Sequence, residues 1–137
     1  MARDKFHQEV RKALEGEGWR VTDDPLYLKI GQIPIHIDIG AEQLIGAEKA
    51  GERIAVEIKT FGSTSFIMAF YEAIGKYIVY REALELINSD RVLFLAIPND
   101  IYEEFSSEPL VKKVFSKNKI KLILYEPDIQ KIRSWKS

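Results

Sequence analysis

Apolar side chains recur every three or four residues in two long stretches, which is the pattern of a helix with one buried face. The first stretch covers residues 4–16. The second covers about residues 65–88, and Ser63 or Thr64 can cap its start. Gly75 lies inside the second stretch and costs about 1 kcal/mol relative to alanine, which indicates that close packing requires it. The pattern therefore predicts one helix near the start of the chain and one in its middle.

Strand patterns lie between these helices and after the second one. In residues 35–39, isoleucine alternates with His36 and Asp38, and in residues 53–61 apolar positions alternate with charged ones. The remaining predicted segments are strands at 26–30, 91–97 and 120–127, short helices at 100–105 and 109–118, a lead-in at 19–23, a loop at 40–52 and a tail at 129–135.

The order of these elements predicts an α/β protein with a three-layer α/β/α core and a mixed central sheet. The core order is α-β-β-β-α-β, and helices that alternate with buried strands pack on both faces of a sheet. The early strands are close enough for hairpins, whereas the later connections are long enough for parallel pairing. A chain of 137 residues suits one domain, here residues 1–137.

Composition narrows the classes of function. Apolar residues make up 46% and charged residues 30% of the chain, which is typical of a globular protein. The formal net charge of −1 excludes a protein that coats nucleic acid through bulk charge, so a nucleic-acid contact requires a local patch. Cysteine is absent, which excludes thiolate catalysis and fits a reducing cytoplasm. The apolar runs are too short to span a bilayer, and we expect a cytoplasmic protein that makes no membrane contact.

Three charged residues lie on the polar faces of two predicted strands. Asp38 belongs to the strand at 35–39, and Glu57 and Lys59 belong to the next one. If these strands are neighbours, the two carboxylates converge, and hard oxygen ligands of this kind suit Mg²⁺ or Mn²⁺. A lysine beside the ion suits the hydrolysis of a phosphodiester. The alternative is a solvated strand face, with Asp38 at the start of a turn.

The constellation of Asp38, Glu57 and Lys59 resembles the PD-(D/E)xK, or restriction-endonuclease-like, superfamily. Over nearly the whole chain the sequence resembles the XisH family, the fdxN-element excision controlling factors. The most specific part of this resemblance is "AVEIKTF", followed by a helix with the pattern AxGxYxxY. In the superfamily the core order is also α-β-β-β-α-β. The resemblance implies that Asp38 and Glu57 bind the metal and that Lys59 assists catalysis.

Membership of the XisH family implies a role in DNA rearrangement, in which a DNA element is excised during heterocyst development in cyanobacteria. A separate site-specific recombinase is believed to recombine the DNA, and a small XisI-type partner is also required. Three interpretations stay open. The chain is a Mg²⁺-dependent DNA endonuclease, a non-catalytic accessory factor of the recombinase, or an interaction subunit that acts with the XisI-type protein.

The resemblance also implies auxiliary residues. In several related nucleases a glutamate of the first helix reaches the metal, and Glu9 occupies that helix here. Related nucleases often carry Q-x-x-x-Y on the long helix, where this chain has Lys76 and Tyr80, so Lys76 departs from the pattern. Ordinary helix surface is the alternative for all three.

Expected partners are DNA, a second copy of the chain in a homo-oligomer, and an XisI-type protein. Residues 112–137 contain eight Lys or Arg and two Asp or Glu, a basic region that suits phosphate binding. Tyr102, Phe105 and Trp135 lie in the less regular C-terminal half, where exposed aromatic side chains would mark an interface.

Overall fold

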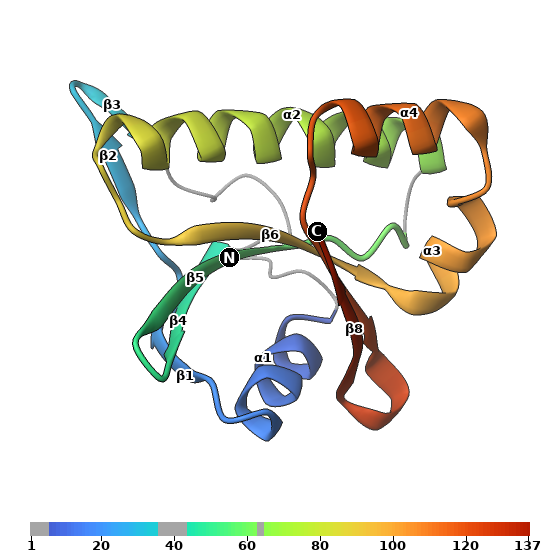
Figure 1. The fold of residues 1–137 in the computed structure, drawn as a ribbon, viewed down its shortest axis with the longest axis horizontal. Coiled ribbons are helices and arrows are strands. Elements are labelled where there is room, and N and C mark those ends of the chain that lie inside the picture. The colour runs from blue at the N-terminus through green and yellow to red at the C-terminus, as the bar shows by residue number, and fades with distance from the viewer. Residues whose placement is uncertain (1–5, 36–43, 63–64) are drawn as a thin grey trace.

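A six-stranded mixed sheet forms the middle layer of the protein, with helix α1 on one face and helices α2, α3 and α4 on the other (Figure 1). The computed structural model describes residues 6–35, 44–62 and 65–137. The elements are α1 (His7–Gly16), β1 (Arg20–Asp23), β2 (Leu28–Ile30), β3 (Ile33–Ile35), β4 (Leu44–Lys49), β5 (Glu52–Ile58), α2 (Phe66–Leu86), β6 (Val92–Pro98), α3 (Asn99–Phe105), α4 (Pro109–Lys117), β7 (Leu122–Glu126), the short 3₁₀ helix η1 (Pro127–Ile129) and β8 (Lys131–Lys136).

The strands of the main sheet follow the order β1-β4-β5-β6-β7-β8. The pairs β1–β4, β4–β5 and β7–β8 are antiparallel, whereas β5–β6 and β6–β7 are parallel. The parallel connections run through α2 and through α3 and α4, as long crossovers require. The predicted three-layer α/β/α architecture, the mixed sheet and the α-β-β-β-α-β order are therefore confirmed.

Two of the three early strands differ from those predicted. Residues 40–52 were expected to form a loop, but they contain β4, which pairs with β5 from Leu44↔Glu57 to Lys49↔Glu52. The strand at residues 35–39 was the predicted neighbour, but both neighbours of β5 in the sheet are other strands, β4 and β6. The described residue of the predicted strand, Ile35, ends β3, which pairs with β2 in a separate two-stranded sheet. Residues 19–23 were predicted as a lead-in and residues 129–135 as a tail, but these segments contain β1 and β8, the two edge strands of the sheet.

β4 resembles a loop in the sequence because it contains a glycine, Gly46, and a close approach by Arg91 explains why glycine is needed there. A Cβ atom at Gly46 would lie 2.7 Å from Nη1 of Arg91, so a side chain at this position has no room. That nitrogen donates to the carbonyl of Ile54 on β5 at 2.8 Å. The other terminal nitrogen, Nη2, donates to Asp23 on β1 at 2.9 Å. Gly46 therefore makes β4 hard to recognise in the sequence, and in the structure it leaves space for the guanidinium that joins β1 to β5.

Each face of the sheet has its own hydrophobic core. On the α1 side, residues of α1, β4, β5 and β7 pack together, including Val10, Ile45, Val56 and Ile123. On the α2 side, alternate residues of the same strands pack against α2. A central strand covered on both faces has no solvated side. None of the helices among the described residues is long and apolar enough to cross a membrane.

Helix α2 carries two corrections to the sequence prediction. Its N-cap is Ser65, whose hydroxyl accepts a hydrogen bond from the backbone N–H of Met68 at 3.4 Å. The predicted caps, Ser63 and Thr64, lie outside the described residues. Gly75 was expected to be closely packed, but a Cβ atom there would meet nothing within 4 Å, so the glycine lies on an open helix face.

Candidate functional site

Glu57 lies near the end of β5 and Lys59 directly follows this strand. Both side chains lie on the sheet face that α2 covers, as their spacing predicts. Both residues are buried. Glu57 is 1% exposed and Lys59 is 9% exposed. The alternative of a solvated strand face is therefore wrong, because β5 lies between β4 and β6 in the middle of the sheet. A carboxylate and an ammonium in such a position are costly to bury without a compensating role.

A carboxylate from α2 joins this pair. Nζ of Lys59 lies 3.0 Å from Oε1 of Glu72, which is itself half-exposed. Nζ of Lys76, one turn further along α2, lies 3.5 Å from the same oxygen. The cationic ends of Lys59 and Lys76 therefore meet at one carboxylate at the C-terminal end of β5. The arrangement holds the Lys59 ammonium in a fixed position and places one exposed acidic group beside it.

The other predicted site residues fall into two groups. Asp38, the predicted second metal ligand, lies outside the described residues. Tyr80 is 5% exposed and belongs to the core beneath α2, whereas Glu9 comes from α1 on the opposite side of the sheet. Within the described part of the chain, no group of three or more His, Cys, Asp and Glu side chains is placed to hold a metal ion.

Sequence reasoning missed Glu72. The signal for it was present, because Glu72 precedes Lys76 by four residues, the spacing at which opposite charges meet on a helix. The contact with Lys59 could not be read in this way, since it depends on how α2 crosses the end of β5. The structure therefore brings together Lys59, Glu72 and Lys76, and Glu57 lies two positions before Lys59 on the same side of the sheet.

Tyr77 anchors the same helix to the sheet. Its hydroxyl donates to the carbonyl of Leu93 on β6 at 3.0 Å and accepts from the backbone N–H of Lys121, next to β7, at 3.1 Å. Burial raises the pKa of this hydroxyl above its ordinary value, so it stays protonated as a donor. The AxGxYxxY pattern thus places two structural tyrosines, Tyr77 and Tyr80, on the inner face of α2.

These features define a three-layer α/β/α protein whose central strand carries a buried Glu-x-Lys pair held against a helix carboxylate. The chain belongs to the XisH family. The family model "XisH protein" matches residues 1–133.

Two solved structures support this assignment. One is of a fdxN element excision controlling factor protein from Anabaena variabilis, with a TM-score of 0.89 and 37% identity over 96% of this chain and 98% of that chain. The other is of an XisH family protein from Nostoc punctiforme PCC 73102, with a TM-score of 0.89 and 38% identity over 98% of this chain and 100% of that chain. The comparison with curated proteins gave no match.

Proposed function

We propose that this XisH-family protein acts in the controlled excision of a DNA element and that it hydrolyses phosphodiester bonds with the help of Mg²⁺ or Mn²⁺. The observation that carries the proposal is the burial of Glu57 and Lys59 on one face of the sheet, with the Lys59 ammonium held at 3.0 Å by Glu72. The role in excision is supported by the relative from Anabaena variabilis, which is named as a fdxN element excision controlling factor protein.

The residues fit a divalent cation in their chemistry. Glu57 supplies a hard oxygen donor, and Asp38 would supply the second carboxylate. The ammonium of Lys59 can donate hydrogen bonds to a phosphate oxygen and offset its negative charge. A bound metal ion would polarise the phosphate and lower the pKa of a water molecule. Glu57 and Lys59 would thus divide the work between holding the ion and binding the phosphate.

The proposal predicts metal binding that depends on Glu57. Calorimetric titration with Mn²⁺ should give saturable binding to the wild type, and Glu57→Gln should weaken it by more than tenfold, about 1.4 kcal/mol. The amide keeps the side-chain volume, so urea denaturation should show the same or slightly higher stability. Cleavage of duplex and branched DNA should then be lost in Glu57→Gln and in Asp38→Ala. A wild type that binds no divalent ion and cuts none of these substrates contradicts the proposal.

The second candidate function is that of a non-catalytic accessory factor, which assists a recombinase together with an XisI-type partner. The observation that favours it is the engagement of Lys59, whose ammonium is already occupied by Glu72 and nearly excluded from solvent. Co-purification of the chain with a co-expressed XisI-type protein, in the absence of metal-dependent cleavage, would support this candidate over the first.

The aromatic residues expected to mark an interface are half-buried and contact other parts of the same chain. The ring of Phe105 stacks on Phe66 at 3.7 Å between centroids, and Trp135 lies 5.6 Å from Trp19. Tyr102 lies beneath the ammonium of Lys136. These contacts give no support to an interface at the C-terminal half.

Helix α2 carries several exposed apolar side chains. Met68, Tyr71, Val79 and Leu86 are each more than half exposed, and with the open Gly75 they follow helical spacing along one face. The stripe is about 27 Å long at 1.5 Å per residue. We propose that a second copy of the chain covers it, because Gly75 near its middle permits two helices to approach closely and a two-fold axis pairs the same patch on both copies.

Self-association is therefore expected to depend on this stripe. Light scattering at tens of micromolar should give a dimer for the wild type, whereas Tyr71→Glu and Val79→Glu should give monomers, since each places a charge in an apolar contact. Ile129→Glu is the matched control, because Ile129 is 57% exposed and lies on η1, outside the stripe. A monomeric wild type, or equal dissociation by Ile129→Glu, contradicts the proposed dimer.

A further inference from the structure

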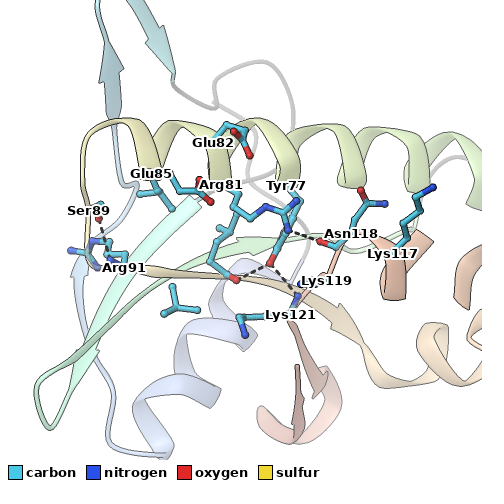
Figure 2. Close-up of a pocket in the computed structure, with 13 residues that line it drawn as sticks. Tyr77, Arg81, Glu82, Glu85, Ser89, Arg91, Lys117, Asn118, Lys119 and Lys121 are labelled. Atoms are coloured by element: carbon cyan, nitrogen blue, oxygen red, sulfur yellow. Dashed lines mark hydrogen bonds between the residues drawn. The ribbon is translucent and has the colours of Figure 1, made fainter. Parts of the chain in front are cut away.

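A second charged hollow lies at the other end of α2 from Lys59. It has a volume of about 550 Å³ and is formed by the C-terminal half of α2, the start of β6 and the turn from α4 into β7 (Figure 2). Ile58 pairs with Ala96 near Lys59, whereas Val92 and Leu93 at the opposite end of β6 line the hollow. The hollow and the Glu57–Lys59 pair thus lie at opposite ends of one sheet face.

Cationic side chains dominate the lining. Arg81, Arg91, Lys117, Lys119 and Lys121 contribute five positive charges, against two carboxylates from α2. The two carboxylates belong to Glu82 and Glu85.

The arginines are already fixed in place. The guanidinium of Arg81 lies 5.3 Å from the Tyr77 ring centre and donates to the carbonyl of Asn118 at 2.5 Å (Figure 2). Arg91 is held by Ile54 and Asp23, as described above. A binding site with preset cations loses little side-chain entropy when an anion enters.

The three lysines are not needed by the fold. Basic residues often offset the partial negative charge at a helix C-terminus, but carbonyls in the last turn of α4 already have backbone donors, Phe115 from Ile120 and Ser116 from Lys119. Arg81 satisfies Asn118, and the side-chain amide of Asn118 donates to the carbonyl of Val114 at 3.0 Å. The ammonium groups of Lys117, Lys119 and Lys121 form no ion pair with a residue that the structure describes.

We infer that this hollow binds the phosphate groups of a nucleic-acid strand. Lysine acts as a point charge on phosphate, and arginine adds directed donors. The cations come from separate elements, with Arg81 on α2, Lys117 on α4, and Lys119 and Lys121 on the connection to β7, so they suit successive phosphates along a strand. The choice of DNA as the strand rests on the proposed function. DNA would then be bound at one end of α2 and cleaved at the other.

Binding to DNA without metal tests this inference. Fluorescence anisotropy of a labelled duplex, measured in EDTA, should show at least about tenfold weaker binding for the triple variant Lys117→Ser, Lys119→Ser, Lys121→Ser than for the wild type. The slope of log affinity against log salt should become shallower by about 2.7, since each phosphate contact contributes about 0.9. The matched control replaces three exposed lysines elsewhere, Lys12→Ser, Lys113→Ser and Lys131→Ser, with the same change in net charge. Its affinity should stay within about threefold of the wild type.

The outcomes separate this inference from the proposed function. Equal losses in the triple variant and in the control, or no DNA binding by the wild type, overturn the inference. Titration with pyrophosphate and ATP tests free phosphates, and binding of these alone, with the same dependence on the three lysines, also overturns a polymeric ligand. A wild type that binds DNA through the lysines but neither binds Mn²⁺ nor cleaves supports the inference while the nuclease proposal fails. If the triple variant cleaves DNA and binds it with wild-type affinity, the nuclease proposal is supported while the inference fails.

Discussion

Arg91→Ala is expected to lower the free energy of unfolding by about 3–5 kcal/mol, the range for breaking a buried charged network by removing one partner. The side chain of Arg91 is 5% exposed and donates to Ile54 on β5 and to Asp23 and Thr22 on β1. Burial lowers the pKa of its guanidinium from the ordinary value, which reflects the cost of keeping this charge inside. Alanine would leave the carbonyl of Ile54 without its donor and open a space over Gly46.

Urea denaturation of two further variants checks this explanation. Gly46→Ala places a methyl group 2.7 Å from Nη1 of Arg91 and should cost about 1–3 kcal/mol through overpacking. In the double variant with Arg91→Ala, the two costs should not add, because the clash disappears with the guanidinium. Arg53→Ala is the control, since Arg53 forms an exposed pair with Asp90 at 2.8 Å and should cost less than about 1 kcal/mol. Equal effects of Arg91→Ala and Arg53→Ala would contradict the role given to Arg91.

Much of the fold could be predicted because the core-forming segments have strong periodicity. The apolar run "VLFLAI" of β6 and the inner face of α2 bury most of their side chains against each other and against the rest of the core, so burial dictates their composition. These segments, with the order of the elements, define the mixed sheet. Local pattern and overall fold agree in these regions, which is why the pattern alone identifies them.

The strands that the sequence pattern missed are defined by contacts between residues far apart in the chain. β4 reads as a loop because Gly46 makes room for Arg91, which is 45 positions away in the chain. β8 has only exposed and half-buried residues. Its Trp135 pairs with Ile123 on β7, and the Trp135 ring packs against Phe94 on β6. No local property of these segments reports on those partners, so propensity and spacing cannot locate them.

The sequence predicted that Glu57 and Lys59 share one face of the sheet, but not that this face is buried. Period-two alternation puts Glu57 and Lys59 on one face of a strand, and that part is confirmed. Alternation does not report whether a helix covers that face, and for this reason a solvated face stayed open as the alternative. Glu72 comes from the covering helix, so its contact with Lys59 follows from the packing of α2 and not from the motif.

A large effect on activity is also expected at Lys59. Under the proposed function, Lys59→Met should lower the rate of metal-dependent DNA cleavage by at least about 100-fold, the typical effect of removing one preset donor from a reacting oxyanion. Methionine keeps the aliphatic stem of a side chain that is 9% exposed, so the core stays filled. Lys59 is not expected to ligate the ion, so calorimetric Mn²⁺ affinity should change by less than about tenfold, 1.4 kcal/mol. Cleavage of labelled duplex DNA under single-turnover conditions gives the rate directly.

Glu72→Gln is the matched control for this prediction, because it removes the partner of Lys59 and leaves the ammonium in place. The Glu72 carboxylate is half-exposed, so its loss should change stability by less than about 1 kcal/mol. If Lys59 acts on phosphate, Glu72→Gln should keep cleavage within about tenfold of the wild type, whereas Lys59→Met abolishes it. If both variants lose activity equally, the ion pair positions α2 and the chemistry belongs to other groups. If Lys59→Met cleaves at the wild-type rate, the lysine serves only to bind Glu72 and Lys59 has no part in the reaction.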